Sequence, residues 1–202
     1  MVTEHFTELA ARSVNEQSAV MLGDFYERVA GRQDFTHWGD KLPDARAARA
    51  LQPLWPQTKF VLIVRDPRDN YCSYRQFARK PEILDKYPEL SNITAADFAR
   101  DWRTLNTGCI DYLHPLHVVR YEKMVAALDA QFAKLLEFLG LPPHPDVHVA
   151  GERPAAYASH GTTRSVAQSV GQWKVELDEQ EVAVIDELTG QDLQRLGYRP
   201  GT

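Results

Sequence analysis

The chain has 202 residues, of which 44% are hydrophobic and 25% charged, and its formal net charge is −5. This length suffices for one domain with its own core, without disulfides or a structural metal. We therefore predict a single domain over residues 1–202. The pI of about 5.8 argues against the broad basic surface typical of nucleic-acid binding. Any anionic ligand must therefore be bound by local groups.

The sequence predicts a cytoplasmic protein. Its two cysteines, Cys72 and Cys109, fit a reducing compartment in which thiols stay free. The longest apolar run, residues 60–64, is far shorter than the roughly 20 residues that span a membrane. The first eight residues, MVTEHFTE, contain acidic residues and no apolar segment, so we expect no secretory signal.

Hydrophobic periodicity predicts the elements of the first half of the chain. Residues 7–30 form an amphipathic pattern, and a shorter helix is expected over residues 45–54. Residues 59–64, KFVLIV, are continuous and β-branched, which is typical of a strand buried on both faces of a parallel sheet. Asp69 is the expected N-cap of a helix over residues 70–78.

The second half alternates in the same way. Thr94 begins a helix with a relative of the capping box, and residues 116–121 predict a second strand. A periodic helix over residues 124–139 is stopped by Gly140, and Asp178 caps the last helix. Strands that alternate with helices indicate an α/β fold with a parallel sheet.

A cationic side chain directly follows the first predicted strand. Arg65 stands at the carboxyl end of that strand, and Ser73 is expected in the first turn of the next helix. Ligands of open α/β sheets bind at this edge, and helix N-termini attract anions. An arginine fork beside a hydroxyl therefore predicts a phosphate site. The alternative is that the charges of a surface turn pair only with one another: Arg65, Asp66, Arg68 and Asp69.

Four blocks in the same order carry a family resemblance. Arg65 and Ser73, bridged by DPRD, look like the 3′-phosphate motif of sulfotransferases that use 3′-phosphoadenosine 5′-phosphosulfate (PAPS). Three other blocks resemble the family's patterns: WGDKLP at 38–43, VVRYEK at 118–123 with FLGLP at 138–142, and SVGQWK at 169–174 with LGY at 196–198. The resemblance covers about residues 35–198 and implies a P-loop-like, three-layer fold around a parallel sheet.

The resemblance also implies roles for particular residues. Arg65 and Ser73 would bind the 3′-phosphate, and Tyr121 would border the adenine, although an aromatic residue at a strand end can equally be core packing. Arg164 and Lys174 are candidate second contacts to the nucleotide phosphates, with solvated surface charge as the alternative.

Sulfuryl transfer requires an acceptor held in line and positive charge near the departing oxygen. Lys41 is the candidate for that charge, because its segment corresponds to one that lines the family's active cleft. His37 or Asp40 is the candidate general base, and the alternative role for His37 is a turn cap.

One departure from the family pattern bears on activity. The family begins with a strand and a glycine-rich loop, roughly PxSGTT, that holds the 5′-phosphosulfate, and no such loop precedes Trp38. The similar residues 161–164, GTTR, follow no buried strand. The fold is therefore expected to be N-terminally truncated. Three explanations stay open: a truncated member, an inactive relative that keeps the 3′-phosphate site, or an active enzyme with a rebuilt loop.

The resulting prediction is transfer of a sulfuryl group from PAPS to a hydroxyl or amine of a small-molecule or lipid-like acceptor. The alternative is a non-catalytic remnant that binds nucleotide or a partner protein without transfer. Nucleic acid is not an expected partner, and a homo-oligomer stays open. Prolines interrupt the two spaced histidine pairs, so no metal site is predicted: His114 with His117, and His144 with His148.

Overall fold

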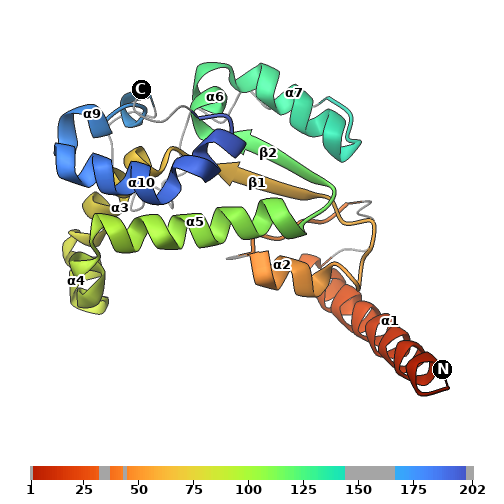
Figure 1. Ribbon diagram of the computed structural model, residues 1–202. Coiled ribbons are helices and arrows are strands. Elements are labelled where there is room, and N and C mark those ends of the chain that lie inside the picture. Colours follow the sequence, from red (N-terminus) through yellow and green to blue (C-terminus); the bar gives the residue numbers. More distant parts are fainter. Residues whose placement is uncertain (1, 32–36, 43–44, 144–166, 199–202) are drawn as a thin grey trace.

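The structure, a computed structural model, describes residues 2–31, 37–42, 45–143 and 167–198. Within these ranges, helices pack against a two-stranded parallel sheet formed by β1 (Phe60–Val64) and β2 (Leu116–Arg120) (Figure 1). The register runs from Phe60 beside Leu116 to Val64 beside Arg120. The predicted parallel pairing is confirmed. The described part is mostly helical, and the wider sheet expected of a three-layer fold is not seen in it.

Two long helices pack on the sheet, and both begin where the sequence predicts. α5 (Ala95–Tyr112) starts with a capping box between Thr94 and Asp97, and α10 (Glu179–Arg195) starts with one between Asp178 and Glu181. In each box the N-cap side chain accepts from a backbone N–H, and the acidic side chain three residues later accepts from the N-cap backbone.

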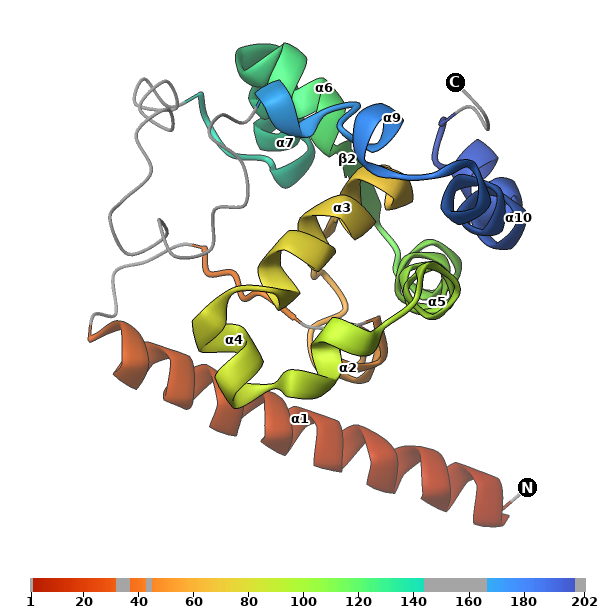
Figure 2. The same ribbon diagram turned by 90° about the vertical axis from the view of Figure 1, so that its left-hand side faces the viewer.

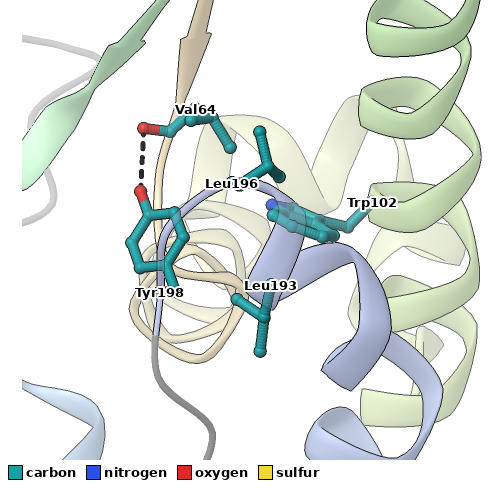
Figure 3. Close-up of a cluster of buried hydrophobic side chains, with 5 residues drawn as sticks. All are labelled: Val64, Trp102, Leu193, Leu196 and Tyr198. Carbon is teal, nitrogen blue, oxygen red and sulfur yellow. Dashed lines mark hydrogen bonds between the residues drawn. The ribbon is translucent and has the colours of Figure 1, made fainter.

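The main apolar cluster joins β1 to these two helices. Figure 3 shows Val64 of β1 beside Trp102 of α5, Leu193 of α10, and Leu196 and Tyr198, which follow α10. The polar ends of the two large rings also find partners. The Tyr198 hydroxyl oxygen lies 3.2 Å from the Val64 carbonyl oxygen, and the Trp102 indole N–H donates to the Arg65 carbonyl (3.1 Å). These contacts hold the strand end against the helices and give both ring polar groups a partner.

The expectation that β1 is buried on both faces is wrong for the described residues. Val61 is 39% exposed and Ile63 is 68% exposed, whereas Phe60 and Val64 are buried. Alternate side chains of a strand point to opposite faces. The buried apolar clusters lie on the face that carries Phe60 and Val64, and the Ile63 side chain on the opposite face stays exposed.

The helix after β1, α3 (Pro67–Ala78), begins earlier than predicted. Its N-cap is Asp66, whose carboxylate accepts from the Arg68 backbone N–H (2.9 Å), and Pro67 occupies the first helical position. Proline suits that position because its missing N–H would have no partner inside the helix. The prediction of Asp69 as the N-cap is therefore wrong. Ser73 consequently lies in the second turn of α3 and not in the first.

The predicted helix over residues 124–139 is divided in the structure. α6 (Tyr121–Ala126) and α7 (Leu128–Leu139) are separated at Ala127, whose backbone is extended at φ −151°. Gly140 ends α7 in the left-handed conformation at φ 77°, as predicted. The remaining short elements are α2 (Ala45–Leu51), α4 (Pro81–Lys86), the 3-10 helices η1 (Pro88–Asn92) and η3 (Ala167–Ser169), and α9 (Trp173–Glu176).

The first helix, α1 (Val2–Ala30), is longer than predicted and ends before Gly31 as expected. It runs along the outside of the molecule in both views (Figures 1 and 2). Five of its large apolar side chains are more than half exposed: Val14, Val20, Met21, Phe25 and Val29. No helix among the described residues has the length and apolar character needed to cross a membrane.

Candidate functional site

Arg65 and Ser73 meet in the structure. Arg65 follows β1 directly, and its Nη1 donates to the Ser73 hydroxyl oxygen at 2.7 Å. The guanidinium also lies over the Tyr121 ring, with 4.8 Å between its central carbon and the ring centroid. A cation over an aromatic face is attracted by the ring quadrupole. Three predicted site residues are therefore brought together at one edge of the sheet.

The sheet explains why these residues meet. Val64 and Arg120 are register partners at the ends of the two parallel strands. Arg65 directly follows β1 and Tyr121 directly follows β2, so these two residues lie side by side where the strands end. α3 then turns back from the same edge and places Ser73 within reach of Arg65. This is the carboxyl edge, where ligands of parallel α/β sheets bind.

A segment far along the chain completes the cluster. The second terminal nitrogen of Arg65, Nη2, donates to the carbonyl of Ser169, and the Ser169 hydroxyl lies 3.0 Å from the Tyr121 hydroxyl. Gln172 also enters, because its Nε2 donates to the Ser73 hydroxyl oxygen at 3.0 Å. Residues 169–172 thus form a wall of the site. Sequence reasoning gave no role to Ser169 or Gln172, although both lie in the quoted block SVGQWK.

Asp69 fastens this segment to α3. Its carboxylate accepts from the backbone N–H groups of Gly171 (2.7 Å) and Trp173 (3.1 Å), and the residue is only 2% exposed. Burial raises the pKa of Asp69, while the two amide bonds act in the opposite direction. Gly171 adopts φ 79°, a left-handed conformation that favours glycine. Asp69 thus has a long-range role in place of the predicted local cap.

Arg68 forms a buried ion pair behind the site. The residue is 1% exposed, and its guanidinium donates from two nitrogens to both carboxylate oxygens of Asp66, at 3.0 and 2.7 Å. Its central carbon lies 4.1 Å from the Trp173 ring centroid, and its Nη1 lies 3.5 Å from a carboxylate oxygen of Asp186. The alternative reading of a surface turn is therefore wrong: Asp66 and Arg68 do pair, but they are buried, and Arg65 points to Ser73 instead.

Glu122 connects the two strand ends with the C-terminal part of the chain. One carboxylate oxygen accepts from the Asp66 backbone N–H (2.8 Å), and the other accepts from the Tyr198 hydroxyl (2.7 Å). Burial, followed by the charge of Glu122, raises the pKa of Tyr198. Glu122 lies in the quoted block VVRYEK but was given no role from the sequence. It holds the loop after β1 in place.

The other predicted site residues do not join this cluster in the described structure. His37, Asp40 and Lys41 lie on an exposed segment beside α1. There the Asp40 carboxylate accepts from the Tyr26 hydroxyl at 2.7 Å, and this bond raises the pKa of Tyr26. Lys174 is exposed, with its ammonium 5.5 Å from the Trp173 ring centroid. Arg164 lies outside the described residues.

The cluster has unused capacity to bind an anion. The Arg65 Nε is buried and has no hydrogen-bond partner among the described residues. The Arg65 guanidinium carries a positive charge and lies next to the Ser73 hydroxyl, and Tyr121 adds an aromatic ring. An orphaned cationic donor, a hydroxyl and a ring fit a phosphate with an adjoining planar group. Within the described ranges, no three His, Cys, Asp or Glu side chains are grouped so that they could hold a metal ion.

The fold and this cluster define an α/β protein with Arg65, Ser73 and Tyr121 gathered at the carboxyl edge of its parallel sheet. Comparison with protein-family profiles matches residues 3–176 to the sulfotransferase family. The match spans most of the chain, and the chain belongs to the sulfotransferase family. It includes Arg65, Ser73, Tyr121 and the segment 169–174. A search of curated proteins finds no match.

Proposed function

We propose that the protein is a PAPS-dependent sulfotransferase and that Arg65 and Ser73 bind the 3′-phosphate of the nucleotide. The observation that carries the proposal is the 2.7 Å contact between these two side chains at the carboxyl edge of the sheet. A cation that already lies against a hydroxyl, with a buried donor to spare, is organised for a phosphate. Family membership supports PAPS as the donor.

In this proposal the described residues bind and orient the nucleotide. Arg65 neutralises the 3′-phosphate, Ser73 donates a hydrogen bond to it, and Tyr121 borders the adenine. PAPS supplies the sulfuryl group, and a hydroxyl or amine of a small-molecule or lipid-like acceptor receives it. The sequence supports Lys41 for the charge on the departing oxygen and His37 or Asp40 for the general base. Arg164 and Lys174 are proposed as further phosphate contacts.

Thermal unfolding with adenosine 3′,5′-bisphosphate tests nucleotide binding. A ligand at a hundred times its dissociation constant stabilises a folded protein by about 2.7 kcal/mol, which is a readily measured rise in Tm. We expect this rise in the wild type and its loss in Arg65→Ala. Arg79→Ala is the matched control, because Arg79 is the exposed C-cap residue of α3. An equal rise in Arg65→Ala would overturn the assignment.

A second candidate is a protein that binds nucleotide or a partner without transferring sulfate. It is favoured by the position of Asp40, which pairs with Tyr26 of α1 and not with the Arg65 cluster. Release of adenosine 3′,5′-bisphosphate from PAPS, measured with a panel of hydroxyl and amine acceptors, separates the two. Acceptor-dependent release that requires Arg65 supports the transferase. Tight binding with no release for any acceptor supports the second candidate.

A further inference from the structure

The Ser73 hydroxyl receives two hydrogen bonds and donates none to the described residues. Arg65 Nη1 donates to its oxygen at 2.7 Å, and Gln172 Nε2 donates at 3.0 Å. A guanidinium has no acceptor atom, so the direction of the first bond is fixed. Both lone pairs of the Ser73 oxygen are therefore occupied, and its single proton must point elsewhere.

The direction of the second bond is fixed by another contact. The same Nε2 of Gln172 donates to the backbone carbonyl of Asp69 at 3.0 Å. A carbonyl can only accept, so the atom facing it must be the amide nitrogen and not the amide oxygen. Gln172 is 9% exposed, which leaves its amide little freedom to turn toward water.

The contact with Asp69 also removes a competitor for the Ser73 proton. The Asp69 carbonyl is four residues before Ser73 in the same helix, and serine and threonine side chains commonly donate to such a carbonyl. Thr189 does so elsewhere in this chain, donating to Ile185 at 2.7 Å. At Ser73 that acceptor is already bonded to Gln172. The Asp69 carbonyl is therefore not available to accept the Ser73 hydroxyl proton.

From this arrangement we infer that Gln172 is a positioning residue that directs the Ser73 hydroxyl proton toward the bound 3′-phosphate. The inference rests on the proposed function and adds a residue to its binding site. Gln172 acts at two points, because it fills one lone pair of Ser73 and occupies the Asp69 carbonyl. The phosphate then meets a donor that is already aimed, and little rotational freedom is lost on binding.

Selectivity for the 3′-phosphate provides the test. Calorimetry would compare adenosine 3′,5′-bisphosphate with adenosine 5′-monophosphate, which lacks that group. In Gln172→Met, a side chain of similar length without a donor, the Asp69 carbonyl is free to take the Ser73 proton. We expect affinity for the bisphosphate to fall about fivefold to tenfold, and affinity for the monophosphate to change less than twofold. Gln76→Met is the matched control on α3.

A double-mutant cycle separates positioning from simple support of the fold. In the Ser73→Ala background there is no proton to direct, so Gln172→Met should weaken bisphosphate binding by less than twofold. The inference is overturned if the loss is equal for both nucleotides, or if it is undiminished in Ser73→Ala. Gln172→Glu gives an independent reading, because its carboxylate would accept the Ser73 proton; the expected loss for the bisphosphate exceeds tenfold.

The same measurements distinguish the two proposals. A wild type that binds both nucleotides equally overturns the 3′-phosphate site itself, and the role of Gln172 with it. A wild type that prefers the bisphosphate, with the preference retained in both Gln172 variants, overturns only the role of Gln172. Circular dichroism of each variant checks that it is folded before its affinity is compared.

Discussion

Replacing Asp69 with alanine is expected to release the segment that carries Gln172 from α3. The carboxylate accepts from two backbone N–H groups, those of Gly171 and Trp173. A buried N–H that loses its acceptor costs about 1–3 kcal/mol, and two are left here. Removing a buried carboxylate relieves part of this cost, because the desolvation that raises its pKa disappears. We expect a net loss of about 3 kcal/mol.

Urea unfolding followed by circular dichroism measures this loss. A domain has only about 5–15 kcal/mol of stability, so a change of this size moves the midpoint well beyond error. Asp85→Ala is the control, because Asp85 is an exposed acidic residue on α4. Bisphosphate affinity should fall in Asp69→Ala as well, since Gln172 loses its fixed place. A loss of unfolding free energy below about 0.5 kcal/mol, with an unchanged slope of that free energy against urea concentration, would refute this reasoning.

Three further predictions concern the groups behind the site. Arg68→Ala leaves the Asp66 carboxylate buried without its partner, and unfolding in urea should show a loss of about 3–5 kcal/mol; a loss within error would contradict the buried pair. Tyr198→Phe removes the donor to Glu122 and should lower stability by about 1–2 kcal/mol, read from its Tm, with no change expected if that bond is unimportant. The third prediction concerns pH. Because the pKa of Asp69 is raised in the folded state, protonation of this carboxyl favours folding. This contribution to the free energy of unfolding is fully present below the ordinary pKa of 3.8 and is lost as pH rises through the raised pKa. The stability of the wild type relative to Asp69→Asn should therefore fall with rising pH across the acid range, and a rise would contradict the shift.

Local patterns predicted the parts of the fold that depend on near neighbours. The two capping boxes, at Thr94 and Asp178, are formed within three residues, and both are confirmed. The meeting of Arg65 and Tyr121 could also be predicted, because adjacent parallel strands bring their carboxyl ends to one edge. Such features follow from spacing alone, and spacing is what a single sequence provides.

The remaining features depend on partners about a hundred residues away. Asp69 has the local pattern of an N-cap, but its carboxylate bonds to residues 102 and 104 positions further along the chain. Gln172 reaches Ser73 across 99 residues in the same way. Ile63 was expected to be buried because its strand is continuously apolar, yet its side chain is 68% exposed. No periodicity in the sequence encodes which distant segment supplies a hydrogen bond or covers a face.

The central claim is that Arg65 and Ser73 bind the 3′-phosphate and not another part of the nucleotide. Phosphorus-31 NMR of adenosine 3′,5′-bisphosphate tests it directly, because its two phosphates give separate signals. The second pKa of a phosphate monoester is about 6, and a guanidinium beside it favours the dianion. We predict that the wild type lowers the pKa of the 3′-phosphate and that Arg65→Ala abolishes this shift. A shift confined to the 5′-phosphate, or a 3′ shift that survives in Arg65→Ala, would contradict the account.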